Sequence, residues 1–354
     1  MPTSSNYASL GYVGWTRFSG INGDTAWIRA TTADIKLTQG FEKPDVVDGK
    51  TDKTVYQVKP VEVMGGVSFP AVHEFTGAAY NLAPVTALWS LAMQRSLTLT
   101  GGVVNPDAGD LGSFTTDVKY TTGVGFSYLG TAINSFEFSI AKEENLTINL
   151  DLIGFNRIPL PDALAVPQYV LRNTRVIGWN DVRAAIQSPI GAFPVVASGQ
   201  MRSFNVKVAN NVNKYYALNG QLYPAALLPT KREISGQFVL MGRNTGLADY
   251  VHTSSGTSFN NVIVSGNSSR CTEPNMFWFG YDLSRYTSGY STSCGGTFTV
   301  GLPGCLFEVE EVAFKNDLFE TTTNWHCMPG IEFGVQDRNT TFVGDWPFSS
   351  WTGA

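Results

Sequence analysis

The sequence SFNVKVANNVNKYYALNGQLYPAALLPTKREISGQFVLMG, residues Ser203 to Gly242, sets the interpretation of the whole chain. Its first and last parts alternate apolar and polar side chains, the pattern of a strand with one dry and one wet face. A shorter stretch of the same kind lies at Ser135 to Gly154, where SFEFSIA matches SFNVKVA and LTINLDLIG matches ISGQFVLMG. Each stretch therefore predicts a β-hairpin, and the later one has the longer connection, Asn210 to Arg232.

Two unrelated amphipathic hairpins would also look alike, because alternation is common to both. The shared Ser-Phe start, the terminal glycine and the order of features favour a duplication. We therefore predict two fused β domains, residues 1–165 and 166–354, joined near Pro159 to Pro167.

The composition agrees with a β-rich protein that does not bind nucleic acid tightly. The chain has 354 residues, with 36 Gly, 17 Pro, 22 Phe and 14 Tyr, which is long enough for two cores. Only 15% of residues are charged and the net charge is −5, whereas tight DNA binding requires an excess of Lys and Arg. We expect neither a signal peptide nor a membrane-spanning helix, and synthesis in a cytoplasm.

Further elements follow from local patterns. Strands are predicted at Thr25 to Ala30, Ala33 to Thr38, Val55 to Phe69 and Phe114 to Tyr128, with a polar loop at Gly40 to Thr54. The sequence Pro84 to Arg95 predicts a helix, because proline fits a first turn and Leu88, Leu91 and Ala92 share a face. A second short helix is predicted at Asn180 to Gln187. The last strands are Thr297 to Val300 and Leu306 to Phe314, with a bulge near Phe307 and Glu308.

The sequence contains no complete motif for a catalytic, metal-binding or nucleotide-binding site. His73-Glu74 lacks a second histidine at position 77, and Gly49-Lys50-Thr51 lacks the earlier glycine of a phosphate-binding loop. The adjacent acids Glu143-Glu144 and Glu310-Glu311 are more typical of solvated faces than of a glycosidase pair. We therefore expect a structural or binding protein that is not an enzyme, with no cofactor and no metal.

The four cysteines all lie in the last quarter of the chain. For a protein made in a reducing compartment, buried free thiols are the first expectation and pairing after assembly the second. A zinc site with His326 is a third possibility that lacks the usual ligand spacing. The residues concerned are Cys271, Cys294, Cys305 and Cys327.

The hairpins INSFEFSIAKEENLTINLDLIG and MRSFNVKVANNVNKYYALNG with KREISGQFVLMG resemble the tail tube proteins of long-tailed bacteriophages. The stretch ADIKLTQGFEKPDVVDGKTDKTVYQVKPVEV is similar to that family's first strand, long loop and second strand. The resemblance covers residues 25–155 and, more loosely, 168–315. It implies a mainly β fold, two tandem tail-tube-like sandwich or barrel domains with a side helix each, whose inner sheets join into a ring barrel.

The resemblance also implies rings that stack into a tube through which DNA is ejected. A chain with two fused copies would form a ring of three subunits with pseudo-sixfold symmetry. By polarity, the positions expected to face the lumen are Glu137, Ser139, Asn149, Asp151, Asn205, Lys207, Ser235 and Gln237. The opposite phase, expected in the core, is Phe136, Phe138, Ile140, Leu150, Leu152, Phe204, Val206, Val208, Phe238 and Leu240.

Contacts between stacked rings are expected from the long loops. The candidates are Glu42, Lys43, Asp45, Asp48, Lys50, Asp52, Lys53, Tyr215 and Tyr216. The implied partners are other copies of the chain, a tape-measure protein and double-stranded DNA in the lumen, and a sheath protein if the tail contracts. The implied location is the virion, after synthesis in the host cytoplasm.

Other functions remain open from the sequence. One is a virion β-sandwich that binds a carbohydrate or receptor, with Trp325, Trp346 and Trp351 as a stacking platform. Others are a ring-forming protein at the end of the tail, and a capsid decoration or neck protein.

Overall fold

The fold is mainly β in a computed structural model, and the description covers only part of the chain. The described residues are 14–19, 27–42, 57–74, 84–93, 103–104, 112–121, 124–160, 174–187, 194–196, 201–218, 220–241, 275–282, 297–315, 318–327 and 333–337. Almost all of them lie in antiparallel strands, and one helix, α2 (Pro84–Ala92), accompanies the sheets.

The strands of the first part of the chain form one set of pairings. They are β1 (Gly14–Ser19), β2 (Ile28–Ala30), β3 (Thr32–Ala33), β4 (Lys36–Glu42), β5 (Gln57–Pro70), β6 (Val72–Glu74), β7 (Val103–Val104), β8 (Phe114–Thr121), β9 (Val124–Ile140), β10 (Thr147–Gly154) and β11 (Asn156–Pro159). Strand β1 pairs with β2 and β8, and the first half of β9 pairs with β8 and β11. The second half of β9 pairs with β10, which pairs with β5, which pairs with β4.

The strands of the second part repeat this arrangement. They are β12 (Thr174–Val176), β13 (Val182–Gln187), β14 (Pro194–Val196), β15 (Met201–Ala209), β16 (Val212–Tyr215), β17 (Ala226–Pro229), β18 (Glu233–Met241), β19 (Asn275–Asp282), β20 (Thr297–Lys315), β21 (Leu318–Cys327) and β22 (Phe333–Asp337). Strand β13 pairs with β14 and β19, and the first half of β20 pairs with β19 and β22. The second half of β20 pairs with β21, then β18, then β15.

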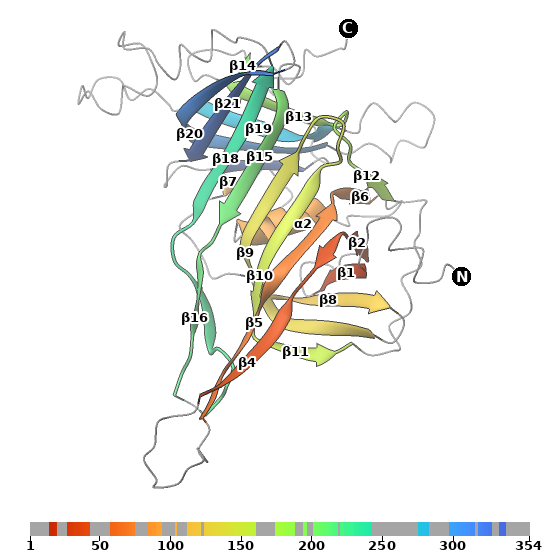
Figure 1. The fold of residues 1–354 in the computed structure, drawn as a ribbon, viewed down its shortest axis with the longest axis vertical. Helices are drawn as coiled ribbons and strands as arrows, with labels where there is room; N and C mark the ends of the chain where they lie inside the picture. Colours follow the sequence, from red (N-terminus) through yellow and green to blue (C-terminus); the bar gives the residue numbers. More distant parts are fainter. Residues whose placement is uncertain are drawn as a thin grey trace, which may run out of the picture.

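Three strand pairings join the two sets: the short pairings of β6 with β12 and of β7 with β22, and the longer pairing of β9 with β15. Strand β9 lies antiparallel to β15, from Ile140 opposite Phe204 to Ser135 opposite Ala209. The result is a long sheet with the strand order β4, β5, β10, β9, β15, β18, β21 and β20 (Figure 1). We call this assembly the long sheet.

The core lies on one face of the long sheet. All ten residues predicted for the apolar phase are at most 8% exposed. Helix α2 packs on this face through Leu88 and Trp89, and the Trp89 ring lies 5.5 Å from the ring centres of both Phe136 and Phe279. Since Phe136 belongs to the first set of strands and Phe279 to the second, the core is continuous across the two sets.

Equivalent glycines mark the same place in both sets. Gly65 in β5 lies opposite Leu152, and Gly236 in β18 lies opposite Trp325. The Gly66 amide donates to Asp34 Oδ1 at 2.7 Å, and the Gln237 amide donates to Asn205 Oδ1 at 2.6 Å. The two hairpins, β4–β5 and β15–β18, therefore share a local backbone arrangement as well as their place in the sheet.

The hairpins matched in the sequence are therefore not equivalent in the sheet. Hairpin β9–β10 has the pairings of β20–β21, whereas hairpin β15–β18 has those of β4–β5. Alternation assigned the faces correctly, but it carries no information on which neighbouring strand pairs with which. A long connection after the first strand is the feature that β4–β5 and β15–β18 have in common.

Several predicted elements are confirmed and one is wrong. The helix at Pro84 and the long strand of β5 are present, and the pairing of β20 shifts register between Phe307 and Val309, at the predicted bulge. Residues 182–187 form strand β13 rather than a helix, because they pair with β19 along its whole length. The loop from residue 43 to 54, Cys271, Cys294 and the segment 253–270 lie outside the described residues.

Candidate functional site

The polar face of the long sheet lies opposite the core and is the first candidate for a functional surface. The eight residues predicted to face a lumen all lie on this face, since each is next to at least one buried residue along β9, β10, β15 or β18. All eight are partly or fully exposed. The structure thus brings these side chains from four strands together into one surface.

Hydrogen bonds link the polar face across the strands. Ser68 Oγ donates to Asn149 Oδ1 at 2.6 Å, and Asn205 Nδ2 donates to Glu137 Oε1 at 3.2 Å. Further along, Gln237 Nε2 donates to Asn324 Oδ1 at 2.9 Å. Cross-strand polar pairs of this kind fix the register and leave the side chains in contact with water.

The polar face carries both acidic and basic residues. Lys207 of β15 lies directly opposite Glu137 of β9, and the two positions mark the junction between the sets. Asp151 Oδ2 accepts a hydrogen bond of 2.6 Å from Asn134 Nδ2. A shallow groove runs over β15, β18 and β21 and is lined by polar residues such as Asn205, Ser235, Gln237 and Asn324. The same groove is also lined by Lys207, Lys231, Arg232 and Glu233, so the surface is polar and carries charges of both signs.

A projecting arm, residues 211–230 with strands β16 and β17, stands at one end of the long sheet beside the ends of β4 and β5 (Figure 1). It is tied to β5 by the Val61 amide, which donates to the Leu222 carbonyl at 2.8 Å. Lys214 Nζ lies 3.5 Å from Glu62 Oε2, and the Tyr216 hydroxyl donates to the Val61 carbonyl at 3.4 Å. Burial, and then the nearby Glu62 carboxylate, raise the pKa of Tyr216.

Large apolar side chains on this arm and the neighbouring strand ends are exposed. Leu218 is fully exposed, Phe41 is 67% exposed and Tyr215 is 56% exposed. Others exposed here are Val58, Leu222, Tyr223 and Leu228. Clustered exposed apolar side chains are typical of an interaction surface. Of the predicted stacking residues, Tyr215 belongs to it, Tyr216 is partly buried against β5, Glu42 ends β4, and the remaining six lie outside the described residues.

Sequence reasoning missed the apolar members of this surface. It selected charged residues and tyrosines in the loops, whereas the exposed set also includes Phe41, Leu218 and Leu228. A leucine in a hairpin arm gives no local signal of exposure. The two prolines and Asn219-Gly220 in the connection indicated a turn, which is the only signal that these leucines might lie outside the core.

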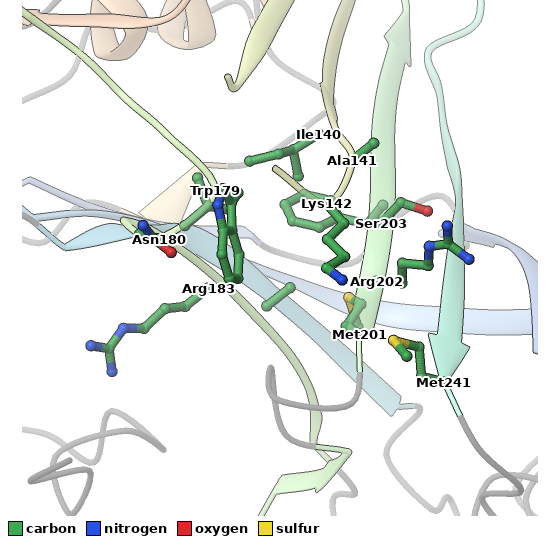
Figure 2. Close-up of a pocket in the computed structure, with 13 residues that line it drawn as sticks. Ile140, Ala141, Lys142, Trp179, Asn180, Arg183, Met201, Arg202, Ser203 and Met241 are labelled. Carbon is green, nitrogen blue, oxygen red and sulfur yellow. The ribbon is translucent and has the colours of Figure 1, made fainter. Parts of the chain in front are cut away.

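A second depression lies at the other end of the junction, where the β9–β10 turn meets the start of β15. Lys142 points into it between Trp179 and Met201, and Arg183 and Arg202 extend in opposite directions (Figure 2). Its lining residues include no Asp, Glu, His or Cys.

Cys305 and Cys327 are register partners on β20 and β21, with Sγ atoms 3.3 Å apart, and both are free thiols. The hydrogen bond with Cys305, followed by burial, raises the pKa of Cys327 well above its usual value. Within the described ranges, no three His, Cys, Asp or Glu residues are grouped so as to hold a metal ion. In the same ranges no helix is long and apolar enough to cross a membrane.

The proposed stacking platform for a sugar does not form as expected. Trp325 is 1% exposed and lies against Phe277, with 4.8 Å between ring centres. It belongs to the core because Thr321, Thr323 and Trp325 occupy the buried phase of β21. Trp346 and Trp351 lie outside the described residues.

Comparison with known proteins identifies a family for this chain. A family model described as phage tail tube protein matches residues 18–267, which is well over half of the chain. No curated protein matches. The match covers β4, β5, α2, the junction of β9 with β15, the arm and β18. The chain belongs to the phage tail tube protein family.

Proposed function

We propose that the chain is the structural subunit of a phage tail tube, and that rings of three subunits stack into the conduit through which DNA is ejected. Each subunit supplies two fused tube domains, residues 1–165 and 166–354, so that a ring has pseudo-sixfold symmetry. The observation that carries this proposal is the long sheet, with an apolar core on one face and a polar surface on the other.

The polar face is the proposed lumen wall. A conduit for DNA must not hold phosphates, because each Lys or Arg that neutralises a phosphate releases a counterion and strengthens binding. Lys207 lies opposite Glu137 on this face, which supports a wall that passes DNA without retaining it. Double-stranded DNA and a tape-measure protein are then contents of the lumen, and the assembled chain is a component of the virion.

The arm is the proposed contact between successive rings. Its exposed leucines and Tyr215, with Phe41 of the adjacent strand, are suited to burial against the next ring. Glu42 and the charged loop residues up to Lys53, together with Tyr216, are proposed to border this contact. The outer surface is left for a sheath protein in a contractile tail.

Electron microscopy of the purified chain in negative stain, at several concentrations, tests the proposal. Hollow tubes or stacked rings with a regular axial repeat are expected, and the ring symmetry tests the duplication. Dispersed compact particles at every concentration would count against a tube subunit. Single rings that never stack would instead favour a ring-forming protein at the end of the tail.

A further inference from the structure

The junction between β9 and β15 shows how two tube domains join within one chain. Strand β9 is the last strand of the first set in the long sheet, and β15 is the first strand of the second set. They pair antiparallel, with Val206 opposite Phe138 on the core face and Lys207 opposite Glu137 on the polar face. The junction therefore combines backbone pairing, apolar contact and opposite charge.

The two strands at the ends of the long sheet, β4 and β20, have edges that correspond to the paired edges of β15 and β9. Among the described residues, no strand pairs with the second edge of β4, nor with the second edge of β20 over residues 306–315. Strand β4 holds the place in the first set that β15 holds in the second, and β20 holds the place of β9. An unpaired edge is a template for another strand, so these edges invite pairing between chains.

Residues of β4 and β15 can be matched one by one. The strand registers align Gly65 with Gly236. The amide that follows each glycine donates a hydrogen bond to a side-chain oxygen of Asp34 or Asn205, which aligns these two residues. Continuing along each strand, Ile35 corresponds to Val206, and Lys36 corresponds to Lys207. Lys36 is exposed and Ile35 is buried, as their counterparts are.

Residues of β9 and β20 can be matched in the same way. Each strand has one unpaired residue in its register with the following strand, Asn134 in β9 and Glu308 in β20. The residues opposite these bulges also correspond, since Leu152 and Trp325 are both buried and both face the matched glycines. Counting from the bulges, Phe138 corresponds to Val312 and Glu137 corresponds to Glu311.

We propose that β20 of one subunit pairs antiparallel with β4 of the next, with Ile35 opposite Val312 and Lys36 opposite Glu311. This inference rests on the proposed tube function and specifies the contact that closes the ring. The free edges of β4 and β20 pair with those of further copies of the chain, because the β9–β15 junction already shows the same kind of antiparallel pairing within one chain. The lysine and the glutamate occur in both junctions, although the neighbouring residues differ.

The pairing closes the ring without leaving a free sheet edge. Internal junctions, β9 with β15, would alternate with junctions between subunits, β20 with β4. Such head-to-tail contacts close into a ring when each repeats the same rotation. Opposite charges at directly paired positions favour this register over a shifted one, because a shift of one residue moves each side chain to the other face.

Engineered cysteines test the register. Under mild oxidation in assembled rings, Lys36→Cys with Glu311→Cys is expected to give disulfide-linked dimers and trimers on a non-reducing gel. The matched control joins Lys36→Cys with Ala313→Cys, two residues away, where Cβ atoms are too far apart for a disulfide. Both carry the same native cysteines, and Lys36→Cys alone gives the background. Equal cross-linking in test and control, in preparations that contain rings, would overturn the pairing and leave the tube function standing.

A charge exchange provides a second readout that needs no cross-link. Lys36→Glu is expected to raise the concentration for half-assembly by roughly fivefold to thirtyfold, and adding Glu311→Lys is expected to restore it. Lys142→Glu, on a turn away from both edges, is the matched control and should leave assembly unchanged. No recovery in the exchanged variant would contradict the pairing. Wild-type chain that forms no rings at any concentration would count against the proposed function itself.

Discussion

Replacement of Gly65 by alanine tests the close approach that both halves of the chain share. A Cβ atom at this position would lie 2.6 Å from the Asp34 carbonyl oxygen and 2.6 Å from Ile35 Cα, whereas ordinary contact begins at about 3.4 Å. Both atoms belong to the backbone, so no rotamer change can relieve the clash. Gly65 also has φ of +150°, a conformation that L side chains rarely adopt.

The expected loss of stability follows from these two effects. A backbone conformation of this kind costs about 1–3 kcal/mol for a residue with a Cβ atom. Moving the Asp34 backbone away would weaken its amide's bond to the Gly66 carbonyl, 3.0 Å, and the bond from the Gly66 amide to Asp34 Oδ1. Each such bond contributes about 1 kcal/mol. We therefore expect Gly65→Ala to lower the free energy of unfolding by about 2–4 kcal/mol.

Thermal unfolding followed by circular dichroism measures this loss, with Gly66→Ala as the matched control. A Cβ at Gly66 would meet the Asp34 side chain at 3.3 Å and the Leu150 carbonyl at 3.4 Å, so the control should lose less than about 1 kcal/mol. Gly65→Ala is expected to lower Tm by roughly 3–5 °C. Equal Tm values for the two variants would refute the steric argument. Gly236→Ala should resemble Gly65→Ala, because its Cβ would collide with the Asn205 carbonyl and the Trp325 ring.

Three further predictions concern titration, oxidation and the arm. Burial raises the pKa of Tyr128 to about 12, so stability that is present below pH 10 should fall as the pH rises from 10 to 12. Tyr128→Phe should flatten that fall in Tm measured against pH, and an unchanged slope would contradict it. Diamide should oxidise the Cys305 and Cys327 thiols to one disulfide, with loss of two protons and two electrons. A disulfide-linked peptide is expected in a non-reduced digest, and the free energy of unfolding should rise by about 3 kcal/mol. Absence of the linked peptide after diamide treatment would contradict the pairing. Leu218→Asp should abolish stacking and leave single rings in electron micrographs, whereas Leu218→Met should still stack, and tubes of the aspartate variant would show that the arm is not the contact.

The faces of the strands could be predicted from the sequence because alternation is local. Phe136, Phe138 and Ile140 are buried and Glu137 and Ser139 are not, whatever strand lies beside β9. The period of two follows from the backbone alone. Helix α2 could be predicted for the same kind of reason, because its proline and its apolar spacing act within one segment.

Pairing partners could not be predicted, because they depend on segments far apart in the sequence. The Ser-Phe motif suggested that the segments beginning at Ser135 and Ser203 are equivalent. In the sheet these two segments are neighbours that pair with each other, and they hold different places in the two sets. The informative residues were less conspicuous. Lys36 and Lys207 each follow an apolar residue in a strand that leads into a long connection, and Gly65 and Gly236 each lie in the strand that returns from it.

The wrong helix has a physical explanation of the same kind. Val182 and Ile186 are four residues apart, which suits a helix face, and Asn180 is a good helix cap. The segment becomes β13 because β19 offers it a complete ladder, and Ala184 is buried there opposite Phe279. Tertiary pairing outweighs the small differences in intrinsic helix propensity.

The Lys–Glu pairs link the assembly of the proposed ring to passage through it. A lysine at a junction on the polar face would hold a phosphate if it stood alone, because the ammonium would replace a counterion of the DNA. Opposite Glu137, Lys207 would instead contribute to the register of the proposed wall, beside a carboxylate that offsets its charge. The same requirement applies to Lys36 if β20 of the next subunit covers it with Glu311. If the proposed junction forms, register and a non-retaining lumen place one common demand on these positions, a lysine opposite a glutamate.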